Sequence, residues 1–355
     1  MNIGDLLLLT KNQNASDLHI NVGVPPTIRI HGTITKTSYP PLTRELSKEL
    51  IYSILSDKQR ASFEETRDID FAIEVEGIAR FRVNVYLERR GIAAVFRTIN
   101  VVIPSIEDLG LPATVLDLAR REKGIILVTG PTGSGKSTTL AAMLDVINTE
   151  RKGHILTLED PIEYVHNHKN CVVSQREIGP HSRTYASALR AALREDPDFI
   201  LVGEMRDLES IQLAIRAAET GHLVLSTLHT MNAPKTIDRI IDVFPPDQQA
   251  QVRTQISESL EGVISQTLIP RVDGQGRVAA IEIMTGVPAI RNLIREAKLE
   301  QIPSTMQVSS KDGMQTMDQS LVMLVQRGLI GQEVALQKCA DRKTMIKMLG
   351  LGIGE

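Results

Sequence analysis

Residues 130–137 read Gly130-Pro131-Thr132-Gly133-Ser134-Gly135-Lys136-Ser137, and Thr138 follows them. The fixed positions match the pattern G-x-x-x-x-G-K-[ST], whose glycines let the backbone turn its N–H groups toward bound phosphates. An apolar run precedes this loop and a helical pattern follows it, so the positive end of a helix would face the anion. The loop, residues 130–138, therefore predicts a site for ATP. Lys136 would reach the β- and γ-phosphates, and the Ser137 hydroxyl would ligate Mg²⁺.

The chain around this loop alternates short apolar runs with helical patterns. The expected strands are 125–129, 155–158, 199–202 and 223–226, and the expected helices are 136–147, 185–193 and 208–219. Apolar strands of this length, separated by helices, are typical of a parallel sheet that is covered on both faces. The sequence therefore predicts an α/β fold for this part of the chain.

The parts before and after this core have other patterns. Residues 1–100 indicate a smaller α+β domain, with a helix at 43–55 and consecutive strands that imply an antiparallel sheet. Pro104, Gly110 and Pro112 favour a linker at 101–112, which leaves 113–355 as the second domain. Two more strand-like runs, 269–272 and 278–283, precede a region that is helical in pattern from about residue 288.

Two groups of acidic residues are candidates for handling magnesium and water. Glu204 ends the apolar strand 199–202, where P-loop enzymes place the acid on the Mg²⁺ side, and its length suits action through a metal-bound water. The other group, Glu159, Asp160 and Glu163, follows the strand that ends at Leu158. We expect that strand beside the phosphate-loop strand and favour Glu163 for polarising the attacking water. The alternative for this group is a solvated acidic loop.

Histidines and arginines supply further candidates. His222 and His229 bracket the strand 223–226, but their odd spacing of seven gives little support to a shared metal site. His229 lies at the carboxyl end of that strand, where open α/β sheets place ligands, although a purely structural histidine is the alternative. Five arginines fall in the strand-rich part of the first domain, at 80, 82, 89, 90 and 97. They are either scattered surface charges or groups that reach a neighbouring subunit's nucleotide.

Composition excludes several classes of protein. Aromatic residues make up only 3% of the 355 residues, there is no Trp, and the formal net charge is −3, so nucleic-acid binding is not expected. Cys171 and Cys339 are far apart, as expected for reduced thiols in a cytoplasmic protein. No stretch approaches the ~20 apolar residues that span a bilayer. We therefore expect no direct membrane insertion, and any membrane association would come through partners.

The order of these motifs resembles the secretion-superfamily ATPases of type IV pili and type II secretion, and most closely their pilus-retraction branch. The matching blocks are 130–138 as Walker A, 158–164 as an acidic "Asp box", 201–207 as a Walker B motif ending in Glu204, and 220–229 as a "His box". Residues 289–296 and 313–318 look like blocks of the retraction branch. The resemblance covers essentially the whole chain, and the set of motifs is highly specific.

The resemblance implies a RecA-like P-loop ATPase domain (113–355, with C-terminal helices) joined to a PAS-like N-terminal domain (1–100). It implies a homohexamer that hydrolyses ATP with Mg²⁺ at the cytoplasmic face of the inner membrane. The partners would be an inner-membrane platform protein and, indirectly, pilin subunits. By the same resemblance, the catalytic residues are Glu163, Glu204, His229, Arg82 and Arg97. His222 and Arg239 would join the loop in binding nucleotide, and Glu204 would act on Mg²⁺ through water.

Residues 289–296 combine an apolar stripe, Ile290, Leu293 and Ile294, with Arg291 and Arg295 four positions apart on another face. This pattern predicts a packed helix with a solvated side, to which the resemblance adds a role in retraction. The competing hypotheses are a RecA-like nucleic-acid motor, a regulatory nucleotide-binding module, and a paralogous pilus or type II secretion ATPase. The extension ATPase of the family carries a four-cysteine zinc site, which this chain lacks, so retraction is favoured.

Overall fold

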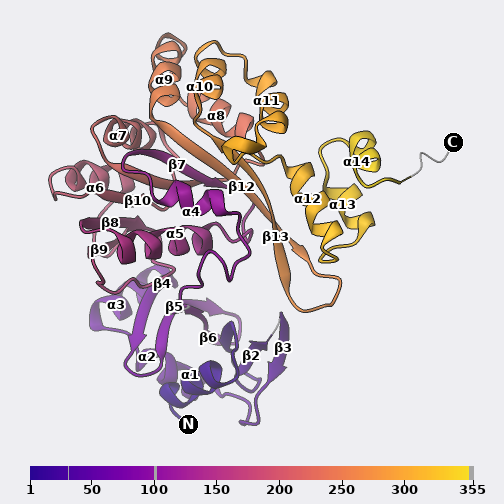
Figure 1. The fold of residues 1–355 in the computed structure, drawn as a ribbon. Coiled ribbons are helices and arrows are strands. Elements are labelled where there is room, and N and C mark those ends of the chain that lie inside the picture. The colour runs from indigo at the N-terminus through magenta and orange to yellow at the C-terminus, as the bar shows by residue number, and fades with distance from the viewer. Residues whose placement is uncertain (31, 100–101, 352–355) are drawn as a thin grey trace. The chain divides into compact units, whose positions relative to one another are not determined.

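The computed structural model describes residues 1–30, 32–99 and 102–351, and the chain divides into two units. The first unit is Met1–Val102 with Glu163–Val165, and the second is Ile103–Ile162 with His166–Glu355. The predicted boundary between the first domain and the linker falls at residues 100 and 101, which lie outside the described residues. Figure 1 shows the elements of both units.

The first unit is built on a six-stranded sheet with the order β3-β2-β1-β6-β5-β4, and every pairing in it is antiparallel. Phe63, Phe81 and Phe96 are among its largest fully buried side chains. Because strand residues alternate between the two faces, one face carries the core and the other carries polar side chains. The elements are α1 (Ile3–Asn12), β1 (Asp17–Ile20), β2 (Thr27–Ile30), β3 (Thr33–Lys36), α2 (Arg44–Tyr52), α3 (Asp57–Thr66), β4 (Asp68–Val75), β5 (Ala79–Glu88) and β6 (Gly91–Ile99).

The second unit holds a seven-stranded sheet with the order β13-β12-β7-β11-β10-β8-β9, in which only the β12–β13 pairing is antiparallel. Its strands are β7 (Gly124–Thr129), β8 (His154–Glu159), β9 (Val172–Glu177), β10 (Phe199–Val202), β11 (Leu223–Leu228), β12 (Leu260–Pro270) and β13 (Arg277–Thr285). Its longer helices are α5 (Lys136–Glu150), α6 (Tyr185–Ala192), α7 (Leu208–Glu219), α8 (Ala233–Asp242), α9 (Pro246–Ser259), α10 (Pro288–Arg295) and α12 (Met317–Gln326). The shorter ones are α4 (Ala113–Ala119), η1 (Leu299–Gln301), α11 (Ile302–Val308), η2 (Ser310–Asp312), α13 (Gln332–Lys338) and α14 (Arg342–Met348).

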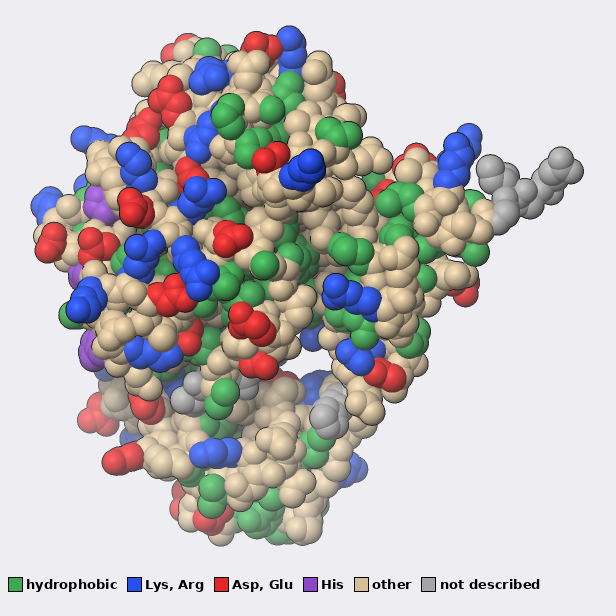
Figure 2. Space-filling view, in the orientation of Figure 1, with side chains coloured by type: hydrophobic (Ala, Val, Ile, Leu, Met, Phe, Trp, Pro, Cys, Tyr) green, Lys and Arg blue, Asp and Glu red, His purple; other side chains and the backbone are tan. Residues whose placement is uncertain are grey.

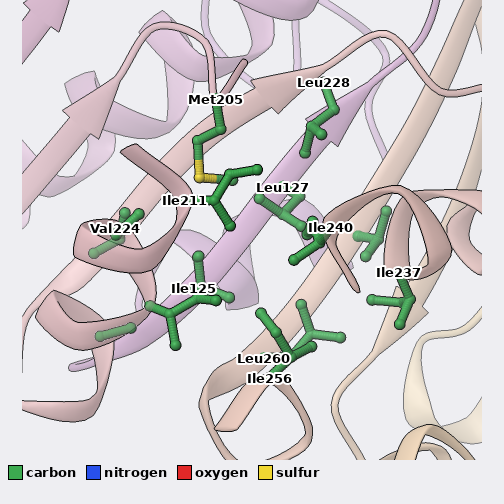
Figure 3. Close-up of a cluster of buried hydrophobic side chains, with 14 of the residues drawn as sticks. Ile125, Leu127, Met205, Ile211, Val224, Leu228, Ile237, Ile240, Ile256 and Leu260 are labelled. Carbon is green, nitrogen blue, oxygen red and sulfur yellow. The ribbon is translucent and has the colours of Figure 1, made fainter. Parts of the chain in front are cut away.

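Both faces of the parallel sheet are covered, which explains the unbroken apolar runs of its strands. Ile125 and Leu127 of β7 pack into a core with α7, α8 and α9, part of which Figure 3 shows. Ile126 and Val128 point to the other face and pack with α4 and α5. The predicted α/β fold class and the parallel sheet are therefore confirmed.

One expectation about strand order is wrong. The strand that leads into the acidic group Glu159, Asp160 and Glu163 is β8, which pairs with β10 and β9, and β11 and β10 separate it from the phosphate-loop strand β7. Sequence patterns give strand positions but not their order in a sheet, because the helices between them can cross to either side. Two further differences are that β12 begins at Leu260, well before the predicted run, and that the sequence analysis did not predict α3, α4, α8, α9, β3 and β9.

Candidate nucleotide site

The phosphate-binding loop connects the carboxyl end of β7 to the first turn of α5. Gly130, Gly133 and Gly135 have φ angles of 139°, 76° and 89°, a backbone region that favours glycine. Gly130 also passes so close to β12 that an added Cβ would lie 2.2 Å from the carbonyl oxygen of Gln266. All three glycines of the loop therefore suit their backbone conformation, and Gly130 is needed for space as well.

Lys136 is the first residue of α5, and its side chain folds back over the loop. Its Nζ donates hydrogen bonds to the carbonyl oxygens of Gly130 at 2.9 Å and Pro131 at 3.1 Å. Pro131, Thr132 and Gly133 form the exposed tip of the loop, whereas Ser134 is buried. Ser137 and Thr138 are half-buried in the first turn of α5. The ammonium group therefore already lies among the backbone groups that would surround a phosphate.

Glu204 lies just beyond the carboxyl end of β10, as the sequence predicted, and contacts an arginine and a histidine. Its Oε2 is 2.7 Å from Arg206 Nη2, and its Oε1 is 3.3 Å from His229 Nε2. Burial alone would raise the pKa of the Glu204 carboxyl, but the hydrogen bond and charge of Arg206, together with His229, hold that pKa below its ordinary value. Glu204 is therefore an ionised carboxylate near neutral pH, as a group that handles Mg²⁺ through water should be.

The two histidines of the predicted His box lie at opposite ends of β11. His229 follows the carboxyl end and contacts Glu204, so the structure joins it to the candidate site. His222 precedes the amino end, about 20 Å away along the strand, and its Nδ1 lies 2.9 Å from the carbonyl oxygen of Ala217 in α7. The structure therefore separates His222 from the loop and gives it a partner at the end of α7.

The acidic residues after β8 have different surroundings from one another. Glu159 is buried, and its Oε1 accepts hydrogen bonds from Thr157 Oγ1 at 2.7 Å and Gln175 Nε2 at 3.2 Å, which suits a structural carboxylate. Glu163 is exposed and is grouped with the first unit, so its predicted role as general base stays a prediction.

Tyr185, at the start of α6, was not singled out from the sequence. Burial, followed by the carboxylates of Asp160, Glu159 and Glu204, raises the pKa of its phenol far above its ordinary value. Its hydroxyl group packs so close to Gly203 that a Cβ there would lie 3.1 Å away. The acidic end of β8 and the end of β10 therefore converge on one neutral phenol, even though β8 is not beside β7.

The predicted arginines of the first unit form part of one row across its sheet. Arg82 on β5 and Arg97 on β6 are direct cross-strand partners, and Asp17 on β1 is the next partner of Arg97. Like charges in such positions repel unless anions compensate. Here Asp70 pairs with Arg82 at 2.6 Å, and Asp17 pairs with Arg97 at 2.9 Å. Because the Arg97 side chain is still 68% exposed, the row can contact a further anion.

Arg239 and the block 289–296 complete the residues that the sequence singled out. Arg239 is exposed in the last turn of α8. In α10, Ile290 and Ile294 are buried and Arg295 is exposed, as expected. The expectation of a solvated Arg291 is wrong, because its guanidinium contacts the backbone oxygens of Ser257, Glu258 and Gly286 and the carboxylate of Glu261. Arg291 therefore holds the end of α9 at the amino end of β12.

Figure 2 shows that acidic and basic side chains are interspersed on the face it presents, over the described residues. A motor that pulls nucleic acid would need a continuous basic surface.

Within the described residues, no helix is long and apolar enough to cross a membrane.

Comparison with known proteins gives a consistent result. The family model described as "Type II/IV secretion system protein" matches residues 7–333. The chain is 55% identical over 338 residues to the Pseudomonas aeruginosa "Type IV pilus retractation ATPase PilT", covering 95% of this chain and 98% of that protein. It is 39% identical over 352 residues to "Type IV pilus ATPase PilU" of the same organism, covering 99% and 92%. The solved structure described as "Crystal Structure of the Pilus Retraction Motor PilT and Bound ADP" has a TM-score of 0.92 and 50% identity, covering 97% of this chain and 98% of that one.

Proposed function

The chain belongs to the type II/IV secretion system protein family, and from that premise we propose that it is the ATPase that powers retraction of type IV pili, and thereby twitching motility. The observation that carries the proposal is the loop 130–138, with Lys136 folded over its carbonyls and ionised Glu204 at the carboxyl end of β10, on the same edge of the sheet. The chain is an ATPase that binds adenine nucleotide at this loop. Retraction is favoured over the related activities because identity to PilT is 55%, against 39% to PilU.

The residues of the loop have separable tasks in this proposal. The backbone N–H groups and the amino end of α5 bind the phosphates of ATP. Lys136 would exchange the carbonyls of Gly130 and Pro131 for phosphate oxygens when ATP binds. Because its ammonium group is already buried among these carbonyls, binding ATP does not have to remove it from water. When bound, Mg²⁺ would be held by the Ser137 hydroxyl and, through water, by Glu204, and it would neutralise charge on the phosphates.

Two residues act on the attacking water or on the charge that develops. Glu163 is the proposed general base, since it is an exposed carboxylate that can accept a proton from water. His229 holds Oε1 of Glu204 from one side while Arg206 holds Oε2 from the other, and this fixes the orientation of the carboxylate.

The proposal extends to assembly and partners. Residues 1–100 form the PAS-like domain, 101–112 the linker, and 113–355 the RecA-like ATPase domain, and six copies form a ring. Arg82 and Arg97, in an exposed row, are proposed to stabilise negative charge on a nucleotide that a neighbouring subunit of the ring holds. Arg239, exposed on α8, is the less central candidate for such a contact. The ring acts at the cytoplasmic face of the inner membrane on a platform protein, and through it on pilins.

Glu163→Gln tests the catalytic part of the proposal. Nucleotide affinity should stay within about twofold of the unmodified chain, because the amide keeps the size of the carboxylate. Steady-state phosphate release should fall by about 10²–10⁴-fold, because the amide cannot accept a proton from water. If turnover barely changes, the base is another residue.

A cell assay tests the motor part. Piliated bacteria that lack their own retraction ATPase should regain pilus shortening, followed with labelled pili, when they express this chain but not its Glu163→Gln variant. If the chain hydrolyses ATP in vitro but restores no shortening in such cells, the assignment to retraction is wrong.

A further inference from the structure

One buried amide side chain lies directly behind the phosphate-binding loop. Gln266 belongs to β12, the neighbour of β7 on the side away from Glu204, and it is only 3% exposed. The residues before it, Val263 and Ile264, are fully buried core residues. A buried primary amide needs hydrogen-bond partners, and the partners of this one lie in the loop and in α5.

Both ends of the Gln266 amide are engaged. Its Nε2 donates to the carbonyl oxygen of Ser134, inside the loop, at 2.7 Å. Its Oε1 accepts from Thr139 Oγ1, in the first turn of α5, at 2.9 Å. One planar group therefore connects the loop, the helix that begins at Lys136, and the sheet.

The backbone of the same residue supports the loop at a second point. An added Cβ on Gly130 would lie 2.2 Å from Gln266 O, so the first glycine of the loop packs directly on this carbonyl. An added Cβ on Gly135 would lie 3.1 Å from Gln266 Nε2. The first and last glycines of the motif thus both rest against one residue of β12.

The strand behind Gln266 is itself held in place. Its partner on β13 is Ile281, whose N–H donates to Ser320 Oγ of α12 at 2.9 Å. The carbonyl oxygen of Ile281 accepts from Gln315 Nε2 at 2.7 Å. Both backbone groups of Ile281 are therefore hydrogen-bonded, which fixes the part of β13 that pairs with Gln266.

We propose that Gln266 is a positioning residue for ATP hydrolysis, which sets the loop and the first turn of α5 so that Lys136 and the loop N–H groups meet the phosphates at the right distance. The proposal rests on the function proposed above, because it assumes that the loop binds ATP. Gln266 makes its contacts to Ser134, Thr139 and the backbone of the loop, so it acts through them.

Only an amide satisfies both partners. Glutamate could accept from Thr139, but its second oxygen would face the carbonyl of Ser134, two acceptors without a proton between them. Leucine has a similar volume and satisfies neither, which leaves the buried Ser134 carbonyl without its donor. Both substitutions should let the loop move relative to α5, and misplacement of reacting groups by about 1 Å can lower a rate by about 100-fold.

The test measures KM for ATP and kcat by steady-state phosphate release for purified Gln266→Leu and Gln266→Glu. We expect kcat/KM to fall by about 10–100-fold in both, with a clear rise in KM, because the phosphate cradle itself is displaced. A purely structural role would lower the folded fraction and hence apparent kcat, and would leave KM unchanged. KM values within twofold of the unmodified chain in both variants would overturn the proposal.

Two further variants keep the test decisive. Gln249→Leu removes an amide that also donates to a backbone oxygen, that of Phe244, at 3.1 Å. It belongs to α9, which packs on α7, α8 and α10, so its loss should lower stability without raising KM. If Gln266→Leu does not fold, Thr139→Val removes one anchor of the amide and should raise KM by a smaller factor. A Gln249→Leu rise in KM equal to that of Gln266→Leu would contradict the proposal. If the unmodified chain shows no ATP turnover, the proposed function is refuted instead.

Discussion

The two ends of the parallel sheet in the second unit use their polar side chains differently. At the amino end, the Arg291 guanidinium contacts three backbone oxygens and Glu261, and the His222 ring contacts the end of α7. At the carboxyl end, Lys136 rests on loop carbonyls, and Glu204 is held by Arg206 and His229 on the surface. Ser134 Oγ, also at this end, is buried without a hydrogen-bond partner among the described residues.

This difference distinguishes charged groups that stabilise the fold from charged groups that a ligand could contact. Groups at the amino end have partners that the fold itself supplies. Groups at the carboxyl end have partners that phosphate or a hydrated cation can replace. The same residue types, Arg, His and Glu, therefore stabilise the fold at one end of the sheet and, in the proposed function, prepare a binding site at the other.

Arg291→Ala is the change that tests the amino end most strongly. The variant should lower the free energy of unfolding by about 2–4 kcal/mol, because it leaves backbone oxygens without their donor and the half-buried Glu261 carboxylate with only the longer 3.4 Å pair to Arg121. Chemical denaturation measures this loss. The kcat per folded molecule should stay within a few fold, because the change lies at the far end of the sheet from the loop.

Arg295→Ala is the matched control from the same helix. Arg295 is exposed, so its removal should change stability by less than about 0.5 kcal/mol. If Arg291→Ala is as stable as Arg295→Ala, the amino end is not a fixed structural network and the contrast fails. Loss of retraction in Arg295→Ala with full ATPase activity would point to a partner-binding role for the exposed side of α10.

The next prediction concerns His166 and a smaller change in the free energy of unfolding, which depends on pH. It precedes β9, is buried, and its Nδ1 lacks a hydrogen-bond partner among the described residues. Burial, with a smaller effect of Lys169, lowers the pKa of His166 from 6.5 to about 4, although Asp145 opposes the shift. As the pH falls from 6.5 toward 4, the unfolded chain takes up a proton that the folded chain does not, so stability falls.

The size of this effect follows from the shift. At about 1.36 kcal/mol per pKa unit, His166 accounts for up to about 3 kcal/mol of acid destabilisation. Denaturation of His166→Phe at several pH values should show a flatter loss of stability between pH 6.5 and 4 than the unmodified chain. An unchanged slope would mean that the His166 ring is hydrated and titrates normally.

Local patterns in the sequence predicted much of the fold. The strand 199–202 and the helix 208–219 were predicted with the bounds that the structure shows, because each is a strong periodic run with a clear stop on either side. The order of the strands was not predictable in this way, and the expected contact of β8 with β7 was wrong for that reason.

The candidate site was predicted where a motif marks it. Glu204 and His229 are in contact at the carboxyl end of the sheet, where the loop 130–138 also follows β7, and their roles stay predictions. His222 is separated from them because the length of β11 lies between the two histidines. Gln266 was missed because a single glutamine carries no motif. The one signal in the sequence is the polar pair Ser265-Gln266 after the apolar residues Val263 and Ile264. In the structure, Ser265 also has a partner at the end of β7, because Thr129 Oγ1 donates to Ser265 Oγ at 2.9 Å.

The most direct measurement is steady-state phosphate release by Lys136→Ala, beside Lys152→Ala, which removes an exposed lysine just after α5. The account predicts that Lys136→Ala falls to the background rate, a loss of about 10²–10³-fold or more, while both variants keep the thermal stability of the unmodified chain. Lys152→Ala should release phosphate at the unmodified rate. Full turnover in Lys136→Ala would contradict the claim that this loop binds the triphosphate.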